Sequence, residues 1–247
     1  MRWTLRLLAA LGYAGLVAAL PAMGQAQTCP RPASDQIPET MIPGERQWHA
    51  RKYAWRRDEI ARQLATTKFG AIALGDSIVQ RWPDDLLASI TGLPTLNAGV
   101  NGDLTQTVAW ELEAPAWSGQ RPRDVFLLIG TNDGGIASPC DIYWGIRNDV
   151  RMIHQALPAA RIFVISILPR GRDMSQRDAS ISMTNRALAE GTAAGGYHYV
   201  DAHDAFLCNH RTPCALMTPR AWVHPSPAGY EILSRIMRQA VASSPSH

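Results

Sequence analysis

The sequence predicts an α/β protein built on a parallel β-sheet that is covered by helices on both faces. Short apolar runs bounded by glycine, proline or charged residues alternate with longer stretches of helical periodicity. Nearly continuous apolar strands are typical of parallel sheets, because the crossover helices bury both faces of each strand. We therefore expect a layer of strands between two layers of helices.

The expected strands and helices alternate along the chain. The strands are Ala71–Leu74, Thr95–Ala98, Val125–Ile129, Ile162–Ile167 and Tyr197–Val200. The helices are Gln47–Thr66, Ile78–Ser89, Thr105–Glu113, Ile142–Ala156, Arg177–Glu190 and Ala228–Ala242. Large apolar residues at helical spacing, such as Trp48 and Trp55, are expected to pack in the core rather than to bind a cofactor. No repeat or second domain boundary is visible, so residues 45–247 are expected to form a single domain.

Residues 1–26 have the pattern of a secretory signal peptide. Arg2 and Arg6 form a basic start, an almost wholly apolar segment follows, and small residues surround Ala26. The apolar segment is short for a membrane span, which needs about 20 apolar residues. We expect cleavage after Ala26, a secreted or periplasmic mature protein without stable membrane insertion, and a proline-rich arm over residues 27–44 that is extended or loosely docked.

Charge and cysteine content limit the partners and the compartment. The net charge of +3 falls to +1 without residues 1–26, which contain two arginines and no acid. The arginines are spread along the chain, so binding to nucleic acid is not expected. Four cysteines remain, and an even number in an exported protein favours disulfides. Cys208 and Cys214 bracket a short loop, and Cys29 with Cys140 would then tie the arm to a loop.

The tripeptide Gly75-Asp76-Ser77 ends the first apolar strand. A serine in this position reaches the carboxyl edge of the sheet, where open α/β proteins bind their ligands. Ser77 is therefore a candidate nucleophile, although the same tripeptide also occurs in ordinary turns.

Two further loops follow neighbouring strands of the expected sheet. Asn132 comes just after the third strand and supplies an uncharged N–H donor, which suits a developing oxyanion. Gly102 follows the second strand and lets the backbone approach a ligand closely. The N–H groups of Ser77 and Gly102 and the side chain of Asn132 are candidate oxyanion donors, and a plain turn asparagine and turn glycine are the alternatives.

Among seven histidines, His224 is the best-placed candidate base. It precedes Ser226, a candidate N-cap, and Pro227, which suits the first position of the last helix. A histidine of near-neutral pKa can take a serine proton and return it to a leaving group. His49 lies on a helix face, and no functional role is predicted for it. No metal site is expected, because no second ligand cluster near Cys208, His210 and Cys214 has a usual zinc spacing.

Four ordered blocks resemble the SGNH (GDSL-type) hydrolases, and are most similar to the branch of platelet-activating-factor acetylhydrolase catalytic subunits. The blocks are Gly75-Asp76-Ser77, Asn97 through Thr105, Gly130-Thr131-Asn132-Asp133 and His224, with further similarity at Ile167-Leu168-Pro169-Arg170-Gly171. The resemblance implies a three-layer αβα fold of the flavodoxin-like type with a five-stranded parallel sheet. It implies Ser77 as nucleophile with Asp76 as a supporting neighbour, His224 as base, an oxyanion hole of Ser77, Gly102 and Asn132, and no cofactor.

One position departs from this family pattern. The family usually has an aspartate three residues before the histidine, where this chain has Ala221. In serine proteases, disabling that acid lowers turnover by roughly four orders of magnitude. We expect the backbone carbonyl of Ala221, or a neighbouring one, to accept the imidazole N–H in its place, which would give a serine–histidine dyad. Asp201 or Asp204 could substitute instead, or the activity could be largely lost.

The residues and the resemblance together predict an exported serine esterase. It would hydrolyse small acyl esters, with acetyl as the expected group, of carbohydrates or lipids through an acyl-enzyme. An O-acetylated glycan is one expected substrate. A binding protein on a weakened hydrolase scaffold and an acyltransferase that uses the same serine are the alternatives.

Overall fold

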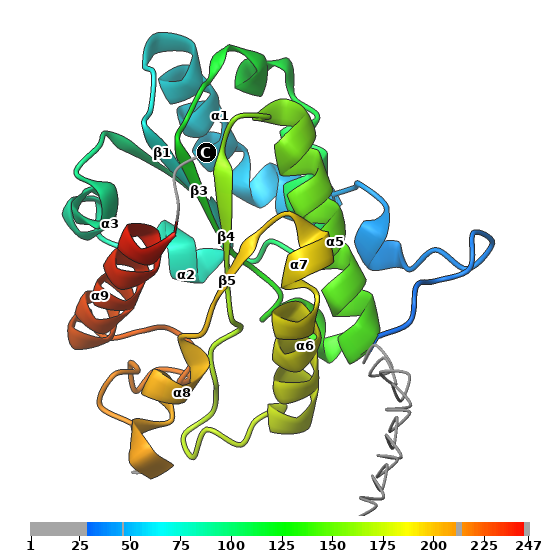
Figure 1. Ribbon diagram of the computed structural model, residues 1–247, viewed down its shortest axis with the longest axis vertical. Helices are drawn as coiled ribbons and strands as arrows, with labels where there is room; N and C mark the ends of the chain where they lie inside the picture. The colour runs from blue at the N-terminus through cyan, green and yellow to red at the C-terminus, as the bar shows by residue number, and fades with distance from the viewer. Residues whose placement is uncertain (1–28, 46, 211–213, 245–247) are drawn as a thin grey trace, which may run out of the picture.

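A computed structural model describes residues 29–45, 47–210 and 214–244 of the chain (Figure 1). In this part of the chain, five parallel strands form one sheet in the order β2-β1-β3-β4-β5. The strands are β1 Ala71–Gly75, β2 Thr95–Gly99, β3 Asp124–Leu128, β4 Arg161–Ile165 and β5 His198–Val200. The predicted α/β fold and its five-stranded parallel sheet are confirmed. The strand order reverses beside β1, and such a switch point is where doubly wound sheets bind ligands.

Helices cover the sheet from two sides. The helices α1 Gln47–Thr66, α4 Thr105–Leu112, α5 Pro139–Ala156 and α6 Asp178–Glu190 pack on one face. The helices α2 Ser77–Gln80, α3 Asp84–Thr91, α8 His203–Phe206 and α9 Pro227–Ser243 pack on the other. Figure 1 shows α3 and α9 on one side of the strands and α5 and α6 on the opposite side. Shorter helical turns are η1 Glu39–Met41, η2 Pro115–Gly119, η3 Asp133–Gly135, α7 Thr192–Gly195 and η4 Cys208–His210.

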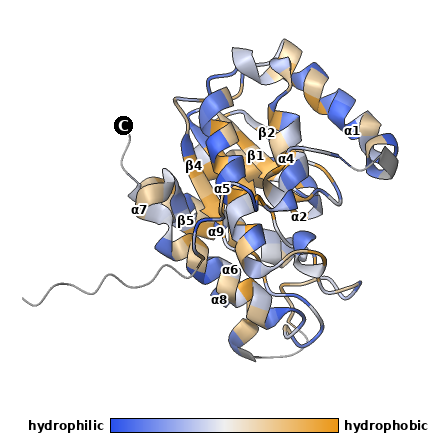
Figure 2. Cartoon of the chain, turned by 90° about the vertical axis from the view of Figure 1, so that its right-hand side faces the viewer, coloured by the Kyte–Doolittle hydropathy of each residue, from blue (hydrophilic) through white to orange (hydrophobic). Residues whose placement is uncertain are grey.

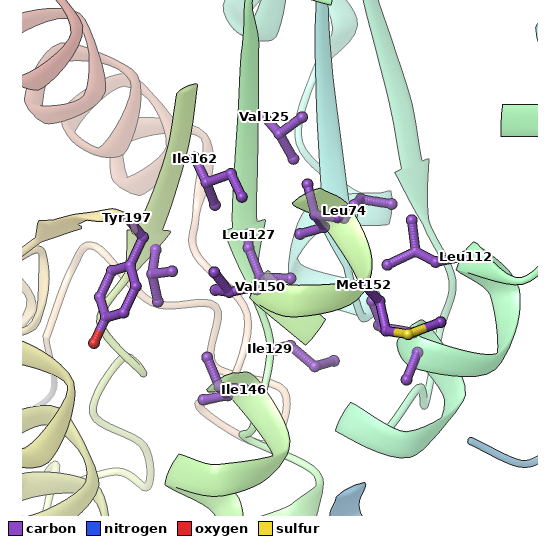
Figure 3. Packing of buried hydrophobic residues seen from close by; sticks show 14 of the residues in the cluster. Leu74, Leu112, Val125, Leu127, Ile129, Ile146, Val150, Met152, Ile162 and Tyr197 are labelled. Atoms are coloured by element: carbon purple, nitrogen blue, oxygen red, sulfur yellow. The ribbon is translucent and has the colours of Figure 1, made fainter. Parts of the chain in front are cut away.

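The central strands are buried on both faces, as the apolar runs predict. In β1, Ile72 and Leu74 join the cluster under α4 and α5, whereas Ala71 and Ala73 join the cluster under α2 and α9. The strands are the most apolar layer in Figure 2, and Figure 3 shows side chains of β1, β3 and β4 packed against α5. The alternation follows from the period of two in a strand, which sends successive side chains to opposite faces.

The helix expected at Ile78–Ser89 is two helices. Helix α2 ends at Gln80, and α3 begins at Asp84 after the N-cap Pro83. A proline disfavours helical backbone in the residue before it, so the helix cannot run through Trp82. The side chain of Asn97 donates to the carbonyls of Val79 and Trp82 at 2.9 and 3.1 Å and so satisfies backbone groups that the break leaves unpaired.

Both expected disulfides are present. Cys29 pairs with Cys140 across 111 residues, and Cys208 pairs with Cys214. The Cys29–Cys140 cross-link closes a long loop, and such a cross-link stabilises a fold by roughly 4–5 kcal/mol in the chain-entropy model.

The rest of the arm contacts the domain through hydrogen bonds. Thr40 Oγ1 donates to the Asp141 carbonyl at 2.6 Å, and the Gly44 N–H donates to the Gln106 carbonyl at 3.1 Å.

The predicted signal peptide, residues 1–26, lies outside the described residues. Within residues 29–45, 47–210 and 214–244, no helix combines the length and the apolarity that crossing a membrane requires.

Candidate active site

Ser77 lies at the sharp turn from β1 into α2. A side chain at Gly75, where φ is +152°, would collide with the carbonyl oxygen of Leu128 on the neighbouring strand. Asp76 caps the helix, and its Oδ1 accepts the N–H of Ile78 at 2.8 Å. Ser77 is thus the first residue of α2, and its N–H is one of the helix-start donors that have no carbonyl partner within the helix. The tight turn delivers the hydroxyl to the carboxyl edge of the sheet.

The hydroxyl of Ser77 meets the imidazole of His224. The distance between Ser77 Oγ and His224 Nε2 is 2.9 Å, although 147 residues separate the two in sequence. The loop that carries His224 is braced by backbone pairing: the Thr218 N–H donates to the His224 carbonyl, and the Ser226 N–H donates to the Leu216 carbonyl, both at 2.8 Å. Ser226 then caps α9, as predicted. The pair has the geometry that proton transfer from serine to histidine requires.

The other ring nitrogen of His224 has no hydrogen-bond partner among residues 29–45, 47–210 and 214–244. The expected hydrogen bond from Nδ1 to the Ala221 carbonyl is not formed there. Asp201 accepts the backbone N–H of His203 at 2.9 Å, and Asp204 Oδ1 lies 3.4 Å from Nδ1 of the His203 ring. Both acids therefore interact with His203 and not with His224. Ala221 and Trp222 have positive φ values of +67° and +48°, which side chains rarely adopt. The position of the imidazole ring is therefore determined by the backbone conformation of its loop and by packing.

Burial and positive charge hold the pKa of His224 low. The pKa falls from 6.5 to about 4, first because the ring is partly desolvated and then because of the nearby charges of Arg81 and Arg170. The ring is therefore neutral at pH 7, and its Nε2 lone pair can accept the Ser77 proton.

This low pKa predicts ester hydrolysis that persists in mild acid. Protonation of His224 removes the lone pair, so kcat/KM for an uncharged aryl acetate is expected to hold down to about pH 5 and to fall as the pH drops through about 4. Asp76 also titrates beside the serine, because burial raises its pKa to about 7. An Asp76→Asn variant isolates the histidine and is expected to keep the same acid limb. An acid limb at pH 6.5 or above in this variant would contradict the low histidine pKa.

The missing acid can be restored at position 221. An aspartate tolerates the positive φ of Ala221 better than most side chains do, so Ala221→Asp is expected to fold normally. A carboxylate beside the imidazole favours its charged form, so the acid limb of kcat/KM is expected to move up by about one pH unit and kcat to rise about tenfold. The measurement is the pH profile of both proteins, with Ala221→Asn as the uncharged control. An unchanged profile would show that position 221 does not face the ring.

Two further loops, which follow the strands on either side of β1, carry the candidate N–H donors. Asp103 N–H donates to the Val100 carbonyl at 3.2 Å, which closes a turn whose third residue is Gly102 with φ +85°. The side chain of Asn132 donates to the Asp103 carbonyl at 2.9 Å. An amide nitrogen carries two hydrogens, so this bond fixes the side chain while a second N–H remains for a ligand. The two loops are thereby joined to each other at the edge of the sheet.

A buried charge network lies beneath the Gly102 turn. His49 Nε2 bonds the Asn101 carbonyl at 2.8 Å, and a Cβ at Gly102 would lie 2.9 Å from that same nitrogen. Arg57 pairs with Asp103 at 2.9 Å and with Glu111 at 2.7 Å. Burial raises the pKa of Glu111 to about 7 and the pKa of Asp103 well above its usual range, whereas the charge of Arg57 lowers both. The network anchors the turn from below.

The role of His49 and Arg57 under this turn is absent from the sequence prediction. The signal that could have found it is the recurrence of Glu45, His49, Tyr53 and Arg57 every four residues, which marks one face of a helix. The sequence places His49 on a helix face but indicates no partner for it, because the Gly102 turn is far away in the chain.

In the part of the chain that the structure describes, no three His, Cys, Asp or Glu side chains are grouped as ligands of a metal ion. The side chains at the sheet edge offer a hydroxyl, an imidazole and N–H donors. This set matches acyl transfer through serine.

A serine–histidine pair at the carboxyl edge of a parallel sheet, with N–H donors from two neighbouring loops, is the arrangement of a serine hydrolase. The chain belongs to the GDSL-like lipase/acylhydrolase family, whose model matches residues 73–232. It is therefore a hydrolase of ester bonds.

Relatives and solved structures agree with this membership. The chain is 27% identical over 185 residues to the platelet-activating factor acetylhydrolase IB subunit alpha1 of Homo sapiens, covering 71% of this chain and 75% of that protein. A GDSL-like lipase from Bacteroides thetaiotaomicron has the same fold, with a TM-score of 0.57, 17% identity, and coverage of 78% of this chain and 96% of its own. The acetyl-xylooligosaccharide esterase Axe2 from Geobacillus Stearmophilus also matches at a TM-score of 0.57, with 18% identity and coverage of 74% and 97%.

Proposed function

We propose that this protein is an exported serine esterase that removes small acyl groups, with acetyl as the preferred group, from esters of carbohydrates or lipids. The observation that carries the proposal is the 2.9 Å contact between Ser77 Oγ and His224 Nε2 in a chain of the GDSL-like acylhydrolase family.

In the proposed reaction, Ser77 Oγ attacks the ester carbonyl while His224 Nε2 takes the hydroxyl proton. The negative charge that develops on the carbonyl oxygen is received by the N–H groups of Ser77 and Gly102 and by the Asn132 side chain. The carbon–oxygen bond to the alcohol then breaks, and Nε2 returns the proton to the leaving oxygen. A water molecule then gives a proton to His224 Nε2 and attacks the acyl carbonyl carbon. The bond from that carbon to Ser77 Oγ breaks, and Nε2 returns the proton to Oγ, which releases the carboxylic acid and free Ser77.

The proposal of a small acyl group rests on the related proteins. One relative is named an acetylhydrolase, and a neighbour in fold is named an acetyl-xylooligosaccharide esterase. An O-acetylated glycan outside the cell is the favoured natural substrate, and a short-chain lipid ester is the other candidate.

Export is supported by the disulfides. The pairs Cys29–Cys140 and Cys208–Cys214 suit an oxidising compartment, and the first residues have the signal-peptide pattern. The proposed mature protein begins at Gln27 and is secreted or periplasmic. Mass measurement of the protein recovered from outside the cytoplasm tests this start, and an intact chain that still contains residues 1–26 would contradict it.

The acyl preference is tested with nitrophenyl esters of increasing chain length. We expect kcat/KM to be highest for the acetate and lower for the octanoate. Brief reaction with the acetate, followed by acid quench and peptide mass analysis, is expected to place one acetyl group on the peptide that contains Ser77. Faster cleavage of the octanoate would contradict the small-acyl proposal, and acetylation at another residue would contradict the assignment of Ser77.

A further inference from the structure

Two arginines flank the pair of Ser77 and His224. Arg81 follows Ser77 by four residues, so the two share one face of the same helical turn, and the Arg81 N–H donates to the Ser77 carbonyl at 3.2 Å. Arg170 follows β4 and donates from Nη1 to the carbonyl and the hydroxyl of Thr131 at 2.9 and 3.2 Å. Thr131 directly precedes Asn132, so one arginine stands on the serine side of the site and the other on the oxyanion side.

Neither guanidinium forms an ion pair with a carboxylate of the described residues, whose ion pairs lie elsewhere. Asp76, whose charge acts on Arg170, is only 1% exposed, and its Oδ1 accepts the Ile78 N–H. Burial raises its pKa to about 7, so it offsets the arginine charges only in part. The positive charges of Arg81 and Arg170 act together on His224.

An arginine cannot shed its charge, and its planar fork matches the geometry of a carboxylate or a phosphate. A ligand that brings such an anion to the rim would meet two guanidinium groups without an ion-pair partner among the described residues. Arg170 already donates from Nε to Gln176 and from Nη1 to Thr131, so its Nη2 is the nitrogen that remains for the anion. This ligand would also act on the chemistry. The imidazole becomes positively charged when it takes the Ser77 proton, and a nearby negative charge stabilises that form. In this chain the carboxylate that usually does so is replaced by Ala221.

We propose that Arg81 and Arg170 bind an anionic group on the substrate, so that the preferred substrates are acyl esters whose alcohol part carries a carboxylate or a phosphate. The substrate's own charge then takes over part of the electrostatic role of the missing acid. This inference rests on the proposed esterase function and names the substrate class of the same site.

A matched pair of substrates tests it. The esters 3-acetoxybenzoate and 3-acetoxybenzamide have nearly the same shape, but only the first carries a charge. After correction for their uncatalysed rates, wild type is expected to hydrolyse the carboxylate ester with about tenfold higher kcat/KM at low salt, which corresponds to about 1.4 kcal/mol. The preference is expected to shrink toward unity near 1 M salt, where the screening length is about 3 Å. The ester 3-acetoxyphenyl phosphate shows whether the site favours phosphate over carboxylate.

Variants assign the preference to the arginines. Arg81→Gln is expected to lower the ratio of kcat/KM for the carboxylate ester to kcat/KM for the amide ester about tenfold. The rate on the amide ester is not expected to fall, because loss of the Arg81 charge raises the pKa of His224 and makes it a stronger base. Arg81→Lys keeps the charge and is expected to retain most of the preference. Arg62→Gln is the control. Arg62 is an exposed arginine at the end of α1 away from His49, and its replacement is expected to change neither rate. Arg170→Gln should also reduce the preference, with an added loss on both esters because it releases Thr131.

The outcomes separate this inference from the function on which it rests. Equal kcat/KM for the two esters, or equal losses on both in Arg81→Gln, would overturn the anion site while leaving the esterase intact. If neither ester is hydrolysed, the affinity of the Ser77→Ala protein for 3-hydroxybenzoate, measured against 3-hydroxybenzamide by calorimetry, decides the question. Selective binding that is lost in Ser77→Ala/Arg81→Gln supports the anion site, and absence of selective binding overturns it.

Discussion

Replacement of Ser77 by alanine is expected to reduce ester hydrolysis to the residual rate that the other residues of the site support without a nucleophile. The hydroxyl 2.9 Å from His224 Nε2 is the only atom of that side chain able to form the acyl-enzyme. Loss of the nucleophile of a serine protease costs on the order of 10⁶ in kcat. In serine proteases the missing acid costs up to roughly four orders of magnitude, so the loss expected here lies between about 10² and about 10⁶. The measured ratio therefore reports how well the pair works without its usual third member.

The double variant Ser77→Ala/His224→Ala supplies the control for this experiment. Residues that act as one unit are not additive, so the double variant is expected to be no slower than Ser77→Ala alone. Unchanged thermal unfolding would show that the substitutions act on chemistry. If wild type and Ser77→Ala hydrolyse a panel of acyl esters at equal rates, the protein is not a serine esterase, and the alternative of a binding protein on a hydrolase scaffold gains support. Faster turnover on adding an acceptor alcohol or sugar would indicate acyl transfer instead.

Replacement of Asn132 by alanine is expected to lower kcat by roughly 10²–10³, which is the effect of losing one oxyanion donor, about 2.7–4 kcal/mol of transition-state stabilisation. The amide is held by its bond to the Asp103 carbonyl and needs no rearrangement when charge develops. Because the donor acts on the transition state, KM for a neutral aryl acetate is expected to change little. Steady-state kinetics with nitrophenyl acetate measures both constants.

A structural role for Asn132 would give a different pattern. If the side chain serves only to join its loop to the turn at Gly102, the loss would appear in the unfolding temperature and in KM together. Asn132→Asp separates the two cases, because a carboxylate has the same shape but offers no N–H and adds a negative charge where the oxyanion forms. Near-normal kcat in Asn132→Asp would remove this residue from the proposed oxyanion hole.

The arrangement at this edge of the sheet makes His224 an unusual base. Its pKa is lowered by burial and by two arginines, while the acid that would raise it is missing. A base of low pKa remains unprotonated in mild acid but is a weaker acceptor. A substrate that carries its own anion would raise the pKa of His224 while it is bound. The proposed anion site would therefore affect proton transfer between Ser77 and His224.

Much of the fold and the proposed site follows from local patterns in the sequence. The apolar runs determine the strands, because each run needs both faces buried, and the strands in turn bring the loops of Ser77, Gly102 and Asn132 to one edge. The capping pattern of Ser226 and Pro227 predicts the start of α9 just after His224. These features depend on residues near one another in the chain, so no knowledge of the tertiary structure is needed.

Other features depend on contacts between distant segments, and only the tertiary structure decides them. The break before Pro83 is stabilised by Asn97 from the next strand, and the Gly102 turn rests on His49 of α1. The sequence shows that no aspartate stands at position 221, and the folded loop shows that the imidazole bonds Ser77 but forms no hydrogen bond with the Ala221 carbonyl. Hydrogen bonds and charges act through space over a few ångströms, so the surroundings of His224 are set by loops that the fold brings together and that no local pattern encodes.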